Sequence, residues 1–147
     1  MITDKKILVI GSGVSGVGAV ELLEKAGASP ILYDSSEKLK EEEVRSRLPE
    51  GSRAEIILGT LPEEVKRETE LVILSPGVPV DLPLVEDMRR HGATIWGEVE
   101  LAWHFGKGKV AAVTGTNGKT TTTTLVGEIF KSWFPKVFVV GNIGTAY

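Results

Sequence analysis

The stretch ILVIGSGVSG, residues 7–16, decides the fold. The first four residues are apolar and predict a buried strand, and the pattern G-x-G-x-x-G follows at once in residues 11–16. Apolar residues at helical spacing then run from Val17 to Lys25 and stop before Gly27. Glycines in such a turn let the backbone approach a phosphate at the positive end of the helix dipole. The stretch therefore indicates a nucleotide-binding βα unit, although the same glycines would also suit close packing of a strand on a helix.

The segments that follow alternate between short apolar runs and longer helical patterns. This alternation predicts a parallel sheet with helices on both faces, so the fold class is α/β and Rossmann-like. The further strands are expected at residues 31–33, 56–58, 71–74 and 94–96. The helices are expected at residues 36–47, 84–90 and 98–105, the first of them as a solvated surface helix.

A second pattern begins after the flexible segment of residues 106–109. Residues 110–113 are expected as a strand, 118–133 as a helix and 137–140 as another strand, which would make one βαβ unit. A unit of about 40 residues is too small for an independent core. The unit therefore either docks on the first sheet or is the beginning of a truncated domain. We favour truncation and expect two domains, residues 1–105 and residues 106–147.

Composition excludes several classes of protein. The 147 residues carry a net charge of −3 with no basic block, so no nucleic-acid partner is expected. The absence of cysteine excludes disulfides and thiolate metal sites. The first apolar run is too short for a signal peptide or a membrane span. We expect a cytoplasmic monomer with no membrane association.

The segment TGTNGKTT, residues 114–121, is the most informative motif. A strand, a glycine-containing loop, Lys119, Thr120 and a helix form the phosphate cradle of ATP-binding proteins, in which the lysine reaches the β- and γ-phosphates and the hydroxyl contacts Mg²⁺. The general pattern has a glycine where this chain has Val113, so the match is imperfect. The run of threonines continues to Thr124, and Thr122 to Thr124 are expected to pack or to bond back to the helix.

Asp34 keeps a second reading of the first domain open. It follows the second expected strand, near the place where dinucleotide-binding folds carry the acid that binds a ribose. The glycine pattern together with Asp34 would on its own favour NAD or FAD, but Asp34 could also be a simple helix cap. An NAD-dependent oxidoreductase fragment and a non-catalytic nucleotide-binding module are therefore the alternatives.

Five motifs in one order resemble a known family. They read GSGVSG at 11–16, SPGVP at 75–79, GEVEL at 97–101, TGTNGKTT at 114–121 and GNIG at 141–144. This order is similar to that of the Mur ligases that add D-glutamate to UDP-N-acetylmuramoyl-L-alanine, and the resemblance covers the whole chain. The loop of that family lacks the glycine at the position of Val113, so the mismatch disappears.

The resemblance implies the roles of individual residues. The first domain would bind the uridine diphosphate part of the nucleotide sugar through Val14, Ser15, Asp34, Ser35, Ser75 and Gly77, and Asn142 would reach its sugar-peptide end. The loop would bind ATP through Gly115, Thr116, Asn117, Gly118, Lys119, Thr120 and Thr121, with Lys119 catalytic and Thr120 on Mg²⁺. Glu98 and Glu100 open a helix, where acids favour the dipole, and are left outside the site.

The resemblance also implies a reaction. ATP would phosphorylate the substrate carboxylate to an acyl phosphate, which the amine of D-glutamate would attack to form an amide. The D-glutamate site and the other Mg²⁺ ligands of the family lie farther along the chain than Tyr147. This chain is therefore expected to bind the uridine nucleotide and to be inactive alone.

Overall fold

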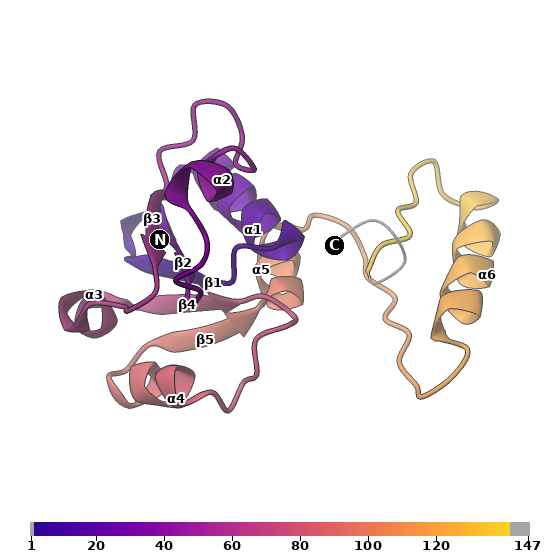
Figure 1. Cartoon of the computed structure of the whole chain (residues 1–147). Helices are drawn as coiled ribbons and strands as arrows, with labels where there is room; N and C mark the ends of the chain where they lie inside the picture. Colours follow the sequence, from indigo (N-terminus) through magenta and orange to yellow (C-terminus); the bar gives the residue numbers. More distant parts are fainter. Residues whose placement is uncertain (1, 142–147) are drawn as a thin grey trace. The chain divides into compact units, whose positions relative to one another are not determined.

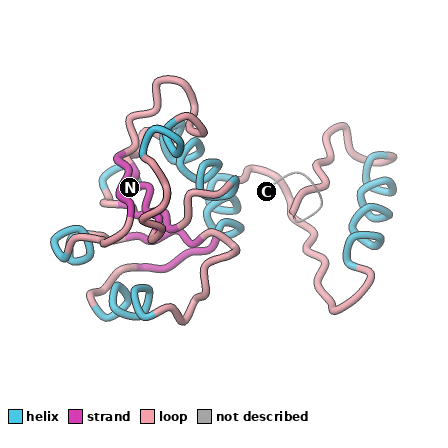
Figure 2. The backbone as a smooth tube through the Cα atoms, in the orientation of Figure 1, coloured by secondary structure: helices cyan, strands magenta, loops and turns pink. Residues whose placement is uncertain are grey.

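The computed structural model describes residues 2–141, and the chain divides into two compact units, Met1–Phe105 and Gly106–Tyr147. Figure 1 shows both units in the colours of the sequence, and Figure 2 marks their helices, strands and loops. Each unit is described by itself.

The first unit is built on a parallel sheet of five strands. These are β1 (Ile7–Ile10), β2 (Pro30–Asp34), β3 (Glu55–Leu58), β4 (Leu71–Leu74) and β5 (Thr94–Gly97). Their order in the sheet is β3-β2-β1-β4-β5, and every neighbouring pair is parallel. All four residues of β1 and of β4 are buried, because helices cover both faces at the centre of the sheet.

Helices connect the strands and cover the two faces (Figure 1). They are α1 (Val14–Lys25), α2 (Glu41–Arg45), α3 (Glu63–Glu68), α4 (Pro83–Arg90) and α5 (Glu98–Phe105), and a short 3-10 turn, η1 (Ile2–Asp4), precedes β1.

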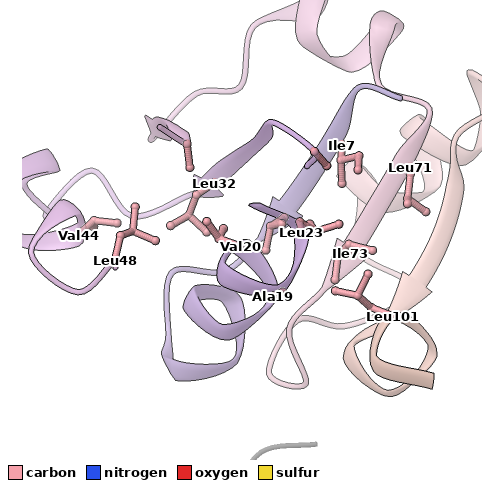
Figure 3. Packing of buried hydrophobic residues seen from close by; sticks show 13 residues of the cluster. Ile7, Ala19, Val20, Leu23, Leu32, Val44, Leu48, Leu71, Ile73 and Leu101 are labelled. Atoms are coloured by element: carbon pink, nitrogen blue, oxygen red, sulfur yellow. The ribbon is translucent and has the colours of Figure 1, made fainter. Parts of the chain in front are cut away.

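Alternate strand residues enter two separate hydrophobic clusters, one on each face of the sheet. Figure 3 shows the first cluster, in which Ile7 and Ile73 of the sheet pack with Leu23 of α1, Val44 of α2 and Leu101 of α5. The second cluster joins the other strand residues, such as Leu8 and Val72, to Val85 and Met88 of α4. The α/β class with a sheet buried on both faces is therefore confirmed.

The strand order sets the switch point of the sheet. The chain moves outward from β1 to β2 and β3, returns across β1 to β4, and then moves outward in the other direction to β5. In open α/β sheets ligands bind in the crevice outside the carboxyl ends of the strands, at the point where the order reverses. Here that point lies between β1 and β4, where the glycine-rich turn and Ser75 follow their strands.

Two connections of the first unit differ from the expectation. The helix expected over residues 36–47 is only Glu41–Arg45, because the Ser36 amide donates to Oδ1 of Asp34 and the Leu39 amide to the Ser36 carbonyl, which turns the chain first. The helix Glu63–Glu68 was not expected, since six residues are too few to show a helical period.

The second unit holds one helix within its described part, α6 (Lys119–Lys131). Its Gly127 is buried against Val139, where an added Cβ would lie 2.3 Å from a methyl carbon. The expectation of strands at 110–113 and 137–140 was wrong, since the structure assigns none there. A strand is stable only beside another strand, and the sheet of the first unit uses none of these residues.

Candidate nucleotide-binding site

Backbone bonds join the ends of three strands at the switch point. The Gly11 amide donates to the Tyr33 carbonyl at 2.8 Å, and the Ser75 amide donates to the Ile10 carbonyl at 3.1 Å. The Ser75 hydroxyl donates to the Gly11 carbonyl at 3.3 Å, so the loop after β4 is tied to the glycine-rich turn.

Two of the three motif glycines are required by close contacts. Gly11 has a φ of +103°, and a Cβ there would lie 2.9 Å from Oγ of Ser75. A Cβ on Gly16 would lie 1.8 Å from the Gly11 carbonyl oxygen, which no side chain could tolerate. Gly13 begins α1 and has nothing within 4 Å of the place of a Cβ. Close packing therefore explains Gly11 and Gly16, while Gly13 leaves open space at the positive end of α1.

Asp34 ends β2 and binds the glycine-rich turn. Its Oδ2 accepts hydrogen bonds from the Ser12 amide at 2.9 Å and from the Ser12 hydroxyl at 2.6 Å. Its Oδ1 accepts one from the Ser36 amide at 3.0 Å. The alternative that Asp34 caps a helix is wrong, because the N-cap residues of α1 and α2 are Gly13 and Lys40, and neither helix has a side-chain cap hydrogen bond.

These contacts decide the charge of Asp34. Partial burial on its own would raise the pKa of this carboxyl, because it disfavours the charged form. The hydrogen bonds from Ser12 and Ser36, together with the positive charge of Arg47, outweigh burial and hold the pKa below its ordinary value. Asp34 is therefore a carboxylate at neutral pH, ready to accept a hydrogen bond from a ligand.

Val14, Ser15, Ser35 and Gly77, also expected to bind the uridine nucleotide, lie on loops or at the start of a helix. Val14, 85% exposed, and half-buried Ser15 form the first turn of α1. Ser35 is exposed after β2, and exposed Gly77 lies in the turn closed by the Val78 amide on the Ser75 carbonyl at 2.9 Å. Asn142 lies outside the described residues.

Glu100 has a structural contact that fits its exclusion from the site. Its carboxylate accepts a hydrogen bond from the Gly97 amide at 2.6 Å, just before α5 begins at Glu98. A glutamate that reaches back in this way forms half of a capping box and satisfies an amide that the helix leaves unbonded.

The loop of residues 114–118, which is expected to bind ATP, has two glycines with positive φ. Gly115 and Gly118 have φ values of +149° and +74°, and α6 begins directly after Gly118. The Lys119 ammonium donates to the carbonyls of Gly115 and Thr116, which keeps the cation at the loop. The amides at the start of α6 supply the positive end of a helix dipole at the same place.

The threonines of the loop and of α6 differ in their contacts. Thr116 and Asn117 of the loop are exposed, as are Thr120, Thr121 and Thr122 of α6. The hydroxyls of Thr123 and Thr124 donate to the carbonyls of Lys119 and Thr120 at 2.8 and 2.9 Å, so bonding back to the helix is confirmed for these two.

Metal ligands are few in the described part of the chain. Across residues 2–141 no group of three or more His, Cys, Asp or Glu side chains is placed to hold a metal ion. Thr120 offers a hydroxyl oxygen, the kind of donor that Mg²⁺ takes in phosphate sites, but it is one ligand of an octahedral set.

Residues 5–97 match the family described as Mur ligase MurD-like, N-terminal domain. The chain belongs to this MurD-like family. The match covers the sheet from its first strand to its last and includes the glycine-rich turn, Asp34 and Ser75.

Curated relatives of this MurD-like chain carry the name UDP-N-acetylmuramoylalanine--D-glutamate ligase. The one from Lachnoclostridium phytofermentans is 55% identical over 143 residues, which are 97% of this chain and 32% of the relative. The one from Lachnospira eligens is 50% identical over 144 residues, 98% of this chain and 32% of the relative. The chain thus spans about a third of the length of the curated relatives it matches.

A solved structure shares the MurD-like fold at low sequence identity. It is a pseudomurein peptide ligase type C from Methanothermus fervidus, 23% identical, with a TM-score of 0.54 over 87% of this chain and 26% of that one. In this chain no helix within residues 2–141 is long and apolar enough to cross a membrane.

Ser12 is the residue of this MurD-like site that sequence reasoning missed. It stands at a variable position of G-x-G-x-x-G, and only the fold shows that its hydroxyl meets the carboxylate of Asp34. The two residues are 22 positions apart in the sequence, so no local pattern signals this contact.

Proposed function

We propose that this chain is the nucleotide-binding front part of a cytoplasmic, ATP-dependent ligase that adds D-glutamate to UDP-N-acetylmuramoyl-L-alanine. The observation that carries the proposal is a MurD-like domain whose switch point combines an open helix start at Gly13 with the carboxylate of Asp34. This chain does not span about two thirds of the relatives' length. In this proposal the D-glutamate site and most of the catalytic residues belong to that part.

In this proposal the first unit binds the uridine diphosphate. The start of α1, with Val14 and Ser15, offers amides and a dipole to the diphosphate. Asp34 accepts a hydrogen bond from a donor of the nucleoside, and Ser35, Ser75 and Gly77 also contact the nucleotide. Asn142, which lies outside the described residues, is proposed to bind the sugar-peptide end.

The second unit begins the ATP site. Residues 115–121 would surround the phosphates, with Lys119 neutralising charge on the transferred group and Thr120 holding one position of Mg²⁺. A carboxylate is a poor electrophile, so ATP supplies activation by phosphorylation, while this chain's residues bind and orient the phosphates.

The test of the uridine site is a calorimetric titration with UDP. We expect the chain to bind UDP and Asp34→Ala to weaken binding by about 1–3 kcal/mol, because a hydrogen bond to a charged acceptor is lost. Asp4→Ala in η1, which precedes the amino end of β1, removes the same charge and is the matched control. Tight binding of NAD with no response to UDP would favour the oxidoreductase alternative.

The test of the ligase assignment is phosphate release with nucleotide sugar, ATP, Mg²⁺ and D-glutamate. We expect none from the 147 residues alone, because the other Mg²⁺ ligands and the amino-acid site are missing. In the full-length protein Lys119→Ala should abolish release and leave UDP affinity unchanged, and Lys131→Ala at the other end of α6 is the control. D-glutamate-dependent release by the 147 residues alone would refute the reading of this chain as an inactive part of a ligase.

A further inference from the structure

We propose that Ser12 is a positioning residue that fixes the carboxylate of Asp34 so that Oδ1 is left as the acceptor for the nucleotide. The inference rests on the proposed uridine-nucleotide function, and it adds a residue whose side chain is itself closed off from the ligand.

The contacts of Ser12 all go to one oxygen. Ser12 is 3% exposed, and its amide and hydroxyl both donate to Oδ2 of Asp34, at 2.9 and 2.6 Å. Oδ1 receives the Ser36 amide at 3.0 Å. A carboxylate has about four acceptor positions, two on each oxygen, so the spare position lies on Oδ1.

Two donors on one oxygen also fix the rotation of the carboxylate. If the carboxylate rotated, Oδ2 would no longer accept the hydrogen bonds from the Ser12 amide and hydroxyl. Ser12 is buried, and a buried donor without a partner costs about 1–3 kcal/mol. The bond from the Ser12 hydroxyl crosses 22 residues of sequence, so it also ties β2 to the turn after β1.

The same pair of donors opposes protonation of Asp34. A proton on Oδ2 would point at the Ser12 donors, and a proton on Oδ1 would occupy the place offered to the ligand. The guanidinium of Arg47 also acts on Asp34 and favours its charged form. The pKa of Tyr33 is raised by burial and, in second place, by the charge of Asp34.

A simpler role for Ser12 would be structural only. A buried hydroxyl needs a partner, and Asp34 would merely satisfy it. Removal of the hydroxyl would then change the stability of the fold but neither the titration of Asp34 nor the part of UDP binding that depends on Asp34. These two readouts separate the two roles.

The first experiment is a double-mutant cycle on UDP affinity, measured by calorimetry at pH 7. We expect Ser12→Ala to weaken UDP binding about fivefold to tenfold, the size of one hydrogen bond. In the Asp34→Ala background the same change should weaken binding less than about twofold, because Ser12 then has nothing to position. Ser46→Ala, which removes a hydroxyl bonded to the Glu43 carbonyl on exposed α2, is the matched control.

The second experiment needs no ligand. The carboxyl carbon of Asp34 is titrated by NMR in the 147-residue chain, in Ser12→Ala and in Ser46→Ala. We expect a pKa below the ordinary value in the unchanged chain and in the control, and a rise of the pKa in Ser12→Ala, because the strongest donor to the charged form is gone. As the pH is lowered, the UDP affinity of Ser12→Ala should therefore begin to fall at a higher pH than the UDP affinity of the unchanged chain does.

The outcomes separate this inference from the proposed function. Failure of the unchanged chain to bind UDP would refute the uridine function, and the titration would still decide whether Ser12 controls Asp34. An ordinary pKa for Asp34 in the unchanged chain, or equal losses from Ser12→Ala with and without Asp34, would overturn the inference. If Ser12→Ala does not fold, Ser12→Gly removes the same hydroxyl, and the titration of the unchanged chain needs no variant.

Discussion

Gly11, Gly13 and Gly16 belong to one motif but lie in different surroundings. The space at Gly16 is filled by the Gly11 carbonyl, and the space at Gly11 by the Ser75 side chain. Gly13 faces open space with an ordinary φ of −74°. At the scale of single residues, the motif therefore holds the turn together at two glycines and keeps the helix start clear at the third.

This difference predicts a large loss of stability for one alanine substitution and a small loss for another. Gly16→Ala should destabilise the fold by about 3 kcal/mol or more, because its Cβ would lie 1.8 Å from a backbone oxygen and the turn would have to move. Gly13→Ala should cost less than about 1 kcal/mol, since alanine is merely a poor residue to begin a helix. Urea denaturation followed by circular dichroism measures both, and equal midpoints would contradict the prediction.

Residue-level prediction from sequence succeeded where a motif carries its own geometry. The glycine pattern located the turn, and Asp34 was expected at the end of its strand, where it is found. The sequence could not show that Asp34 bonds Ser12 rather than a helix amide, because the direction of a hydroxyl depends on how two distant turns meet. The binding roles of the individual residues stay predictions until UDP is titrated.

At the scale of elements, α5 is part of the first unit's core. Its Leu101 is 1% exposed and packs in the cluster that contains Leu23 of α1 and Ile73 of β4. The capping contact of Glu100 sets the start of this helix. The family match ends at residue 97, yet the packed core continues through α5.

Substitutions in α5 test this packing. Leu101→Ala should destabilise the first unit by about 2–5 kcal/mol, because a buried side chain is replaced by a cavity. Val99→Ala, on the same helix but 63% exposed, should change stability by less than about 0.5 kcal/mol. The difference is measured as the shift in urea midpoint, and a negligible effect of Leu101→Ala would mean that α5 is not held in the core.

The accuracy of the predicted elements follows the packing. The five strands were predicted closely because each is a short apolar run that the sheet buries or half-buries. The helix over 36–47 was predicted too long. The segment is mostly charged, so it has no apolar periodicity that would show where a turn ends and the helix begins. The strands at 110–113 and 137–140 have the composition of strands, but composition cannot supply a neighbouring strand.

At the scale of the whole molecule, the two units differ in how much secondary structure they hold. The first has a five-stranded sheet between two layers of helices, whereas the described part of the second has α6 and loops. Several large apolar side chains of the second unit are exposed, among them Leu125, Ile129 and Trp133. The first unit therefore has the larger share of buried contacts.

Hydrogen exchange should separate the two units. We expect the amides of β1 and β4 to exchange only on global unfolding, because these strands are central and buried. Residues 110–113 and 137–140 should exchange many times faster, since no sheet bonds protect them. Strong and uniform protection across residues 110–140 in a monomer would contradict this expectation.

The strand order has a consequence for the synthesis of the protein on the ribosome. The strand that emerges first, β1, lies in the middle of the sheet, and its partner β4 begins about 60 residues later. At roughly 5–20 residues per second, the ribosome needs about 3–12 s to make that stretch. One edge of a wholly apolar strand stays unpaired during this time, so a nascent chain of this fold should be a client for a ribosome-associated chaperone until β4 has emerged.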